Sequence, residues 1–189
     1  ERRGSGRQYS VLSGENGQAK FRGTGSFDML LNEGAVPMGS DAEATARNFL
    51  KKLGISAMKG EGSAEVDVED NGGTVVLCCR SGQTEIINCK VTFTFQRGSL
   101  IIVSGTRPLD DVSLDVSEEE LDFPTVLMRF MDIVSDSGHI FSELQDAELC
   151  YIQTASVSGT GTLTPVWRLQ TDAGDFYING LTGKQETVS

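Results

Sequence analysis

The chain has 189 residues, of which 38% are hydrophobic and 23% are charged, a composition that suits a folded domain and excludes a disordered one. Its formal net charge of −11 disfavours binding to nucleic acid or to anionic lipid, because like charges repel. No apolar run reaches the ~18–20 residues that cross a bilayer, so the sequence predicts a soluble domain.

The N-terminal residues 1–18 are predicted to be a flexible linker. Residues 2–7 are basic, glycine-containing and polar. Because the chain begins at Glu1 without a methionine, we expect a fragment or a processed chain. The basic residues then either follow a membrane anchor that precedes Glu1 or belong to an ordinary linker.

Residues 19–96 predict a first unit in which one helix packs on a small antiparallel sheet. Residues 19–31 alternate between apolar and polar side chains, which predicts a half-buried strand. Ser40 is the expected N-cap of the helix, with Glu43 completing a capping box, and Gly54 is expected to end it. The apolar stripe of the helix is Ala42, Ala46, Phe49, Leu50 and Leu53.

Three strands are expected after this helix, over residues 65–70, 74–80 and 85–96. Asn71-Gly72 and Ser81-Gly82 are the turns between them. The third strand alternates over its whole length, which predicts one core face and one solvent face. Its apolar face is Ile87, Cys89, Val91, Phe93 and Phe95.

Residues 97–189 are predicted to repeat the same order. A turn at Arg97-Gly98 leads to a strand over residues 99–106, and a second helix is expected to start near Pro124 and to end at Gly138. Its apolar stripe is Val126, Leu127, Phe130, Met131 and Val134. Strands are expected over residues 148–156, 165–171 and 175–179. The predicted fold class is α+β, with two tandem units that each have the order β-α-β-β-β.

The four cysteines are Cys78, Cys79, Cys89 and Cys150. In the hairpin that turns at residues 81–83, Cys89 is offset by about four residues from the position opposite Cys78 or Cys79. At about 3.3 Å per residue the offset is roughly 13 Å, beyond the roughly 7 Å that a disulfide spans between Cα atoms. We therefore expect four free thiols that pack as small apolar side chains. One histidine and no CxxC spacing give no zinc site.

Motifs for catalysis are not found in the sequence. His139 is the only histidine, and no nucleophile motif accompanies it. The glycine runs 23–25 and 159–161 do not open a helix, so they predict a bend and a loop instead of a phosphate site. We predict no catalytic, cofactor-binding or metal-binding residues and no cofactor.

Two further features have a structural and a functional interpretation. The acidic stretch lacks the spacing of a calcium loop and is expected to be a solvated connection. It contains Asp110, Asp111, Asp115, Glu118, Glu119, Glu120 and Asp122. Trp167, the only tryptophan, is expected in the core, with a role in a partner-binding groove as the alternative.

The C-terminal hairpin resembles a known family. Pro165-Val166-Trp167-Arg168-Leu169, then Phe176-Tyr177-Ile178-Asn179 and Thr182-Gly183, resemble the closing hairpin of YycI-type (YycH/YycI-like) and PepSY-like extracytoplasmic domains. In the first half, Leu53-Gly54-Ile55, the stretch 93–100 and Ser104-Gly105 are similar to YycI-type proteins. The order of helices and strands is similar over most of residues 19–184. The sequence motif itself is similar only over about the last twenty of these residues.

The resemblance implies the extracytoplasmic domain of a membrane-anchored protein of Gram-positive bacteria. Such a domain regulates a sensor kinase of a two-component system, or a cell-envelope process, by protein contact and without catalysis. The expected partner is a protein, and no nucleic acid is expected. A PepSY-like module that binds or inhibits a peptidase is the first alternative. A hydrolase that uses two carboxylates in a cleft between the units is the second.

Overall fold

The structure, a computed structural model, describes most of the chain. The described residues are 2–6, 9–55, 64–107, 112–115, 119–138, 140–155 and 161–188. The helices are α1 (Ala42–Lys52) and α2 (Phe123–Ser137). The first eight strands are β1 (Arg2–Gly6), β2 (Tyr9–Gly14), β3 (Gly17–Arg22), β4 (Ser26–Leu31), β5 (Ala64–Glu69), β6 (Gly72–Ser81), β7 (Thr84–Gln96) and β8 (Ser99–Thr106). The remaining strands are β9 (Val112–Leu114), β10 (Leu144–Ala155), β11 (Gly161–Thr171), β12 (Gly174–Asn179) and β13 (Gln185–Glu186).

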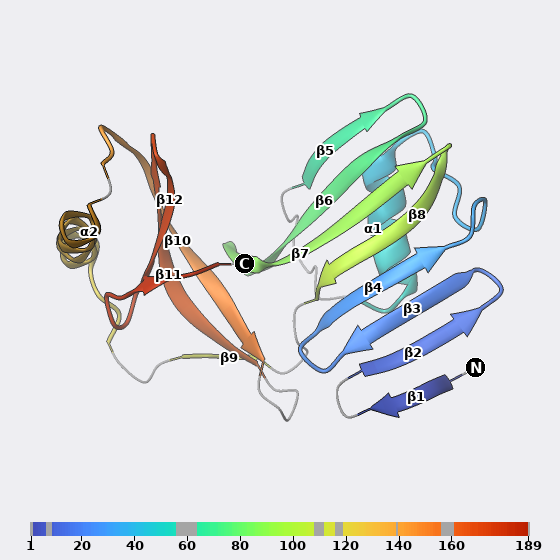
Figure 1. Ribbon diagram of the computed structural model, residues 1–189, viewed down its shortest axis with the longest axis horizontal. Coiled ribbons are helices and arrows are strands. Elements are labelled where there is room, and N and C mark those ends of the chain that lie inside the picture. The colour runs from blue at the N-terminus through green and yellow to red at the C-terminus, as the bar shows by residue number, and fades with distance from the viewer. Residues whose placement is uncertain are drawn as a thin grey trace.

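The strands of the described part form one 13-stranded sheet. Strands β1 to β4 are an antiparallel meander, β8 lies between β4 and β7, and β6 and β5 follow on the other edge of β7. Strand β10 then joins β7 in parallel, with Tyr151 opposite Ile86, and continues into β11, β12 and β13. Figure 1 shows the two groups of strands on either side of this β7–β10 junction.

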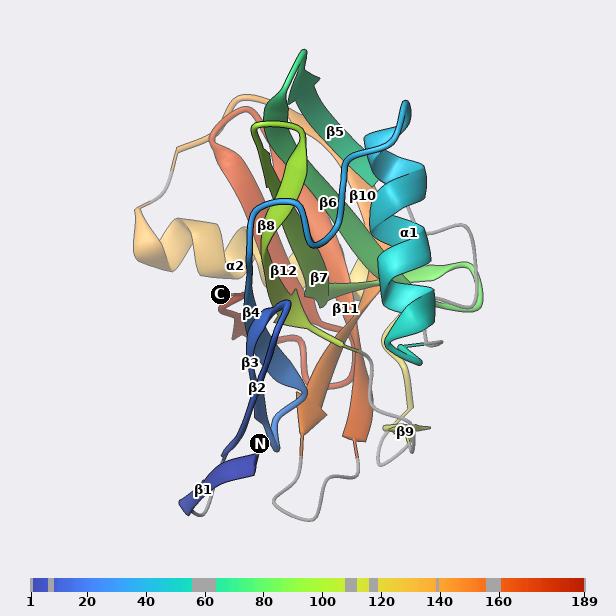
Figure 2. The same ribbon diagram turned by 90° about the vertical axis from the view of Figure 1, so that its right-hand side faces the viewer.

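Helix α1 covers one face of the first group of strands (Figure 2). Its buried side chains Ala42, Ala46 and Leu50 lie four residues apart, so one stripe of the helix reaches the sheet. They belong to one hydrophobic core with strand residues such as Phe27 and Phe93, both with an exposed fraction of 1% or less. The stripe that the sequence predicts for this helix is therefore its packing face, except at Leu53, which is 41% exposed.

The N-cap of α1 differs from the prediction. Asp41 is the cap, and its carboxylate accepts a hydrogen bond from the backbone N–H of Ala44 at 3.1 Å. Ser40 precedes the cap and is exposed. Both residue types are good caps, and the register of the buried stripe against the sheet selects Asp41.

Helix α2 packs on the outer side of β11 and β12, at the left of Figure 1. Asp122 caps it, with its carboxylate accepting from the Thr125 N–H at 3.0 Å, and Pro124 occupies its first turn. The Phe130 ring lies 5.1 Å from the ring of Phe176. The buried residues of this second core are Val126, Phe130, Val134, Leu169, Phe176 and Ile178.

Strand β7 is interrupted by a bulge where the two groups of strands meet. Cys78 of β6 lies opposite Lys90, whereas the next residue, Cys79, lies opposite Ile86. The three β7 residues 87–89 are therefore unmatched on β6. Within this segment the side-chain amide of Asn88 pairs with the backbone of Gln153 on β10, as donor at 2.8 Å and acceptor at 2.9 Å.

The predicted fold class is wrong: the molecule is mostly β and is not two tandem helix-on-sheet units. Strand β8, expected to open a second copy, pairs with β4 and β7 and so continues the first group. Residues 19–31, expected as one strand, are two strands joined by a turn at Gly23–Gly25. Strands β1 and β2 lie in the segment 1–18, where the sequence predicts a linker.

The fold class was wrong because alternating apolar and polar residues predict that a segment is a strand but do not predict which other strand it pairs with. The turn at Arg97-Gly98, with φ values of 51° and 70°, joins β7 and β8 as an ordinary hairpin. The predicted boundary between residues 96 and 97 falls in this turn, and it therefore divides β7 from β8, which pair with each other. Among the described residues, no helix has the length and apolar character needed to cross a membrane.

Candidate binding surface

The face of β2, β3, β4 and β8 that points away from α1 is the candidate site, here called the outer face. Phe27 and Met29 on β4 belong to the core under α1, so the alternate residues Asp28 and Leu30 point the other way. Leu30 lies opposite Ile102 of β8, and their side chains are 57% and 38% exposed. This sheet face therefore presents an apolar pair to solvent.

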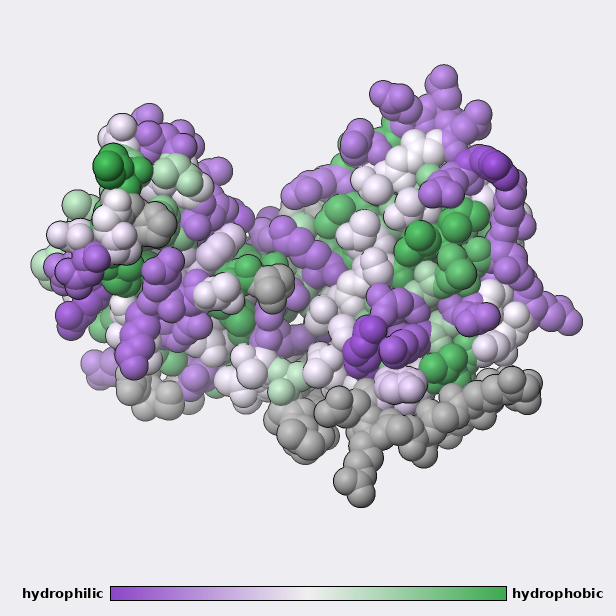
Figure 3. All heavy atoms as spheres, in the orientation of Figure 1, coloured by the Kyte–Doolittle hydropathy of each residue, from purple (hydrophilic) through white to green (hydrophobic). Residues whose placement is uncertain are grey.

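Two cross-strand rows build the outer face. Val11, Lys20 and Asp28 form one row, because β2 pairs with β3 and β3 with β4 in this register. Gln18, Leu30 and Ile102 form the second row, which ends on β8. Figure 3 shows hydrophobic side chains gathered over β4 and β8 on this face, next to hydrophilic ones.

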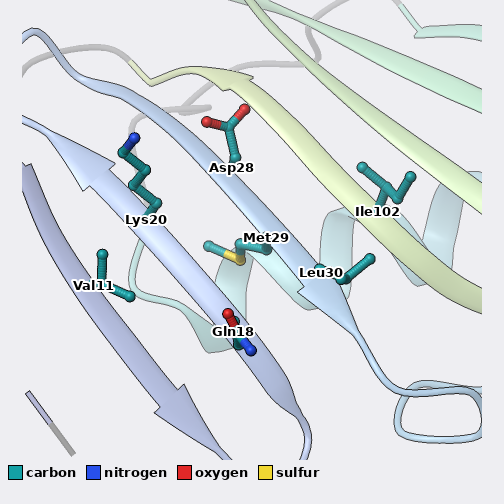
Figure 4. Close-up of a pocket in the computed structure, with 7 residues that line it drawn as sticks. All are labelled: Val11, Gln18, Lys20, Asp28, Met29, Leu30 and Ile102. Atoms are coloured by element: carbon teal, nitrogen blue, oxygen red, sulfur yellow. The ribbon is translucent and has the colours of Figure 1, made fainter. Parts of the chain in front are cut away.

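The two rows enclose an open depression of about 390 Å³ (Figure 4). Its lining residues come from all four strands and are Val11, Gln18, Lys20, Asp28, Met29, Leu30 and Ile102. Most of the lining surface is apolar, and the polar groups are one amide, one ammonium and one carboxylate. A shallow apolar hollow with a few polar groups can bind a partner side chain.

The charges at this site are held by their neighbours on the sheet. Arg22 pairs with Asp28, with the guanidinium 2.7 Å from the carboxylate. The ammonium of Lys20 lies 4.4 Å from the centre of the Tyr9 ring, a cation–π contact. Residues 1–31 carry five Lys and Arg against three Asp and Glu, a formal charge of +2 in a chain of −11. Three of the four strands of the outer face thus lie in a net basic part of an acidic protein.

Ionisable groups also gather at the start of β7 and on β10 and β11. Glu85 is buried, with the Lys90 ammonium 3.8 Å from its carboxylate, and Arg168 pairs with Glu148 at 2.5 Å. Burial raises the pKa of Cys150 to about 11. The Cys150 thiol is therefore uncharged, and the two carboxylates are paired with cations within the sheet.

Two described carboxyl groups have a clearly shifted pKa. Hydrogen bonds from Thr125 hold the pKa of Asp122 below its ordinary value. Backbone N–H groups of Ser142 and Glu143 do the same for Asp172.

The other residues singled out in the sequence lie apart from the outer face. Trp167, expected in the core, is half-buried and packs against the second core beside α2. Its ring centre lies 5.0 Å from that of Phe123. Among the acidic stretch, Asp122 caps α2 and Glu119 and Glu120 are exposed. His139, Asp110, Asp111, Glu118, Gly159 and Thr160 lie outside the described residues.

The cysteines and metal binding can be assessed for the described part of the chain. All four cysteines are buried and unbridged. No group of three or more His, Cys, Asp or Glu side chains in that part is placed to hold a metal ion. The offset argument against a contact of Cys89 with Cys79 is wrong, because the β7 bulge brings the two thiols together.

Sequence reasoning did not predict the outer face. A signal for it is the alternation in β4, where Leu30 and Leu31 are consecutive and so must point to opposite faces of the sheet. One of two adjacent leucines in a strand is therefore exposed unless both faces are covered. Which of the two is exposed depends on where α1 packs.

No protein-family model matches this sequence, and no curated protein is similar to it. The C-terminal domain of Bacillus megaterium YpeB is a solved structure similar to this chain, with a TM-score of 0.49 and 15% identity, over 100% of this chain and 87% of that chain. A likeness at this level decides neither a fold family nor a function. The resemblance to YycI-type and PepSY-like proteins stays a prediction.

Proposed function

We propose that this chain is a non-catalytic interaction domain that binds a protein partner through the outer face. The observation that carries the proposal is the exposed Leu30–Ile102 pair beside the depression. Exposed apolar surface rimmed by polar side chains is typical of protein contact sites. The partner segment that fits is apolar at its centre and acidic at its rim, because three of the four strands around the depression lie in residues 1–31, whose formal charge is +2.

The partner we propose is a sensor kinase or another cell-envelope protein, regulated by this domain outside the membrane. The support is the resemblance of the C-terminal hairpin to YycI-type proteins, together with a surface suited to contact. Anchoring to the membrane would use a segment beyond this chain. The same surface suits the alternative partner, a peptidase bound by a PepSY-like module.

A cross-linking experiment identifies the partner. A photoreactive amino acid replaces Ile102 in the full-length protein, and the cross-linked product from the native membrane fraction is identified by mass spectrometry. Recovery of a sensor kinase or envelope protein supports the proposal, and recovery of a peptidase supports the alternative. A photoreactive residue at Met131, exposed on α2, is the positional control.

An affinity measurement with the purified partner then tests the surface. Leu30→Asp places a charge in the apolar pair and should weaken binding about tenfold or more. Leu114→Asp on β9 is the matched control, since Leu114 is 52% exposed and Leu30 is 57% exposed. Equal affinities for the two variants would show that the outer face is not the contact surface.

A further inference from the structure

Two cysteine side chains lie in contact where β10 joins β7. Cys79 and Cys89 are both fully buried and belong to one cluster with Ile86 and Leu163. The thiol of Cys89 donates to the backbone carbonyl of Thr106 at 3.1 Å. A second hydrogen bond links the side chains of Cys89 and Cys79, so the two sulfur atoms are neighbours.

The bulge in β7 produces this contact. In a regular β6–β7 hairpin continued from the pairs Ser81–Thr84 and Cys79–Ile86, Cys89 would lie opposite Val76. Because residues 87–89 are looped out of the β6 pairing, Lys90 takes the place opposite Cys78. Cys89 is thereby drawn back along the hairpin to Cys79. The bulge is a local feature of the sheet with a chemical consequence.

We propose that Cys79 and Cys89 form a disulfide bond when the chain folds in the presence of a low-molecular-weight disulfide such as oxidised glutathione. One cysteine thiolate attacks a sulfur of the small disulfide, forms a mixed disulfide and releases one small thiol. The second cysteine then attacks the cysteine sulfur of the mixed disulfide and releases the second small thiol. The protein loses two hydrogen atoms, and the small disulfide is reduced to two thiols.

The other two cysteines are not placed for this bond. Cys79 has the largest effect on the pKa of Cys89, through a hydrogen bond, whereas Cys78 has only the smallest, electrostatic one. Cys150 lies on β10, and its pKa responds to the charges of Arg168, Glu148 and Glu85 and to no other cysteine. The hydrogen bond to Cys79 and burial hold the pKa of Cys89 far above its ordinary value, so the attacking thiolate becomes available when the folded hairpin opens locally.

The bond would fix the bulge at which the two groups of strands join. Its formation requires an oxidising compartment, which agrees with the extracytoplasmic location proposed above. The inference is otherwise independent of the outer face, because Cys79 and Cys89 are buried away from it. A failure of either proposal leaves the other standing.

Peptide mapping of the whole chain tests the bond. The reduced, denatured chain is refolded in a mixture of reduced and oxidised glutathione, its remaining thiols are alkylated, and it is digested with trypsin. Peptide 60–80 contains Cys78 and Cys79, peptide 81–90 contains Cys89, and peptide 130–168 contains Cys150. The expected product is peptide 60–80 linked to peptide 81–90, with two alkylated cysteines.

Variants assign the bond within peptide 60–80. Cys78→Ala and Cys150→Ala should keep the linked product, and Cys79→Ala should lose it. The inference is overturned by four alkylated cysteines in the refolded wild-type chain, by a bond between Cys78 and Cys79, or by a link to peptide 130–168. Loss of the linked product in Cys78→Ala with its retention in Cys79→Ala would also overturn it. The wild-type map needs no variant to fold.

Discussion

Single acidic residues hold loops and helix ends in this molecule. Asp172, in the turn between β11 and β12, accepts hydrogen bonds from the backbone N–H groups of Ser142 at 2.9 Å and Glu143 at 3.2 Å. Asp122 does the same at the start of α2. A carboxylate that accepts backbone N–H groups is favoured in its charged form, which is why the pKa of each is lowered.

This arrangement predicts how acid affects Asp172. A pKa lowered by folding means that the charged carboxylate stabilises the folded chain, fully so above its ordinary pKa of 3.8. The stabilisation is lost as the pH falls through the lower, folded-state pKa. Asp172→Asn should therefore be less stable than wild type at pH 6, and the difference should shrink on acidification. Urea unfolding at several pH values measures it; a difference independent of pH would contradict this role.

At the scale of elements, β8 decides the architecture of the first group of strands. Gly105 of β8 lies opposite Phe27 of β4 and Val91 of β7. A Cβ atom at Gly105 would lie 2.1 Å from the Lys90 carbonyl oxygen, closer than atoms can approach. Close approach of two backbones therefore requires glycine at this position.

Replacing this glycine tests the pairing of β8 with β7. Gly105→Ala should lower the free energy of unfolding by about 2–4 kcal/mol, because the backbone of β7 must shift. Gly23→Ala in the β3–β4 turn is the matched control, with no atom within 4 Å of the added Cβ, and should stay within about 0.5 kcal/mol of wild type. Urea unfolding measures both. Similar stabilities for the two variants would show that β8 does not lie against β7 in this way.

At the scale of the whole molecule, the β7–β10 junction joins the two groups of strands. The ladder itself pairs one residue of each strand, Ile86 with Tyr151. The two hydrogen bonds between Asn88 and Gln153 extend this contact by a side chain that imitates a backbone partner. The bulge makes this possible, because it frees Asn88 from pairing with β6.

The junction predicts a change in cooperativity. Asn88→Ala leaves the backbone groups of Gln153 without these partners and should cost about 1–3 kcal/mol. The fluorescence of Trp167, beside α2, and far-UV circular dichroism should give coincident transitions in the wild type and separate ones in the variant. Thr94→Ala, farther along β7, is the control and should keep them coincident. Coincident transitions in Asn88→Ala would show that other contacts couple the two groups.

Local pattern in the sequence was enough to predict the helices and most strands. The stripe with Ala46 and Leu50 and the stripe with Phe130 and Val134 are the buried faces of α1 and α2, whereas Leu53 and Met131, predicted to belong to them, are exposed. The alternation predicted the buried side chains from Ile87 to Phe95, but it missed Glu85 and Ile86, which β7 also buries. These predictions hold because burying one face of an element requires a matching period in the sequence.

Tertiary structure alone decided which strands pair, where β7 bulges and which face remains open. Backbone hydrogen bonds are the same for every strand, so the sequence of β8 does not encode β4 and β7 as its neighbours. The looping out of residues 87–89 depends on β10 arriving at Ile86, far along the chain. Leu30 is exposed, and Cys79 meets Cys89, for the same reason: both follow from contacts between segments that are distant in sequence.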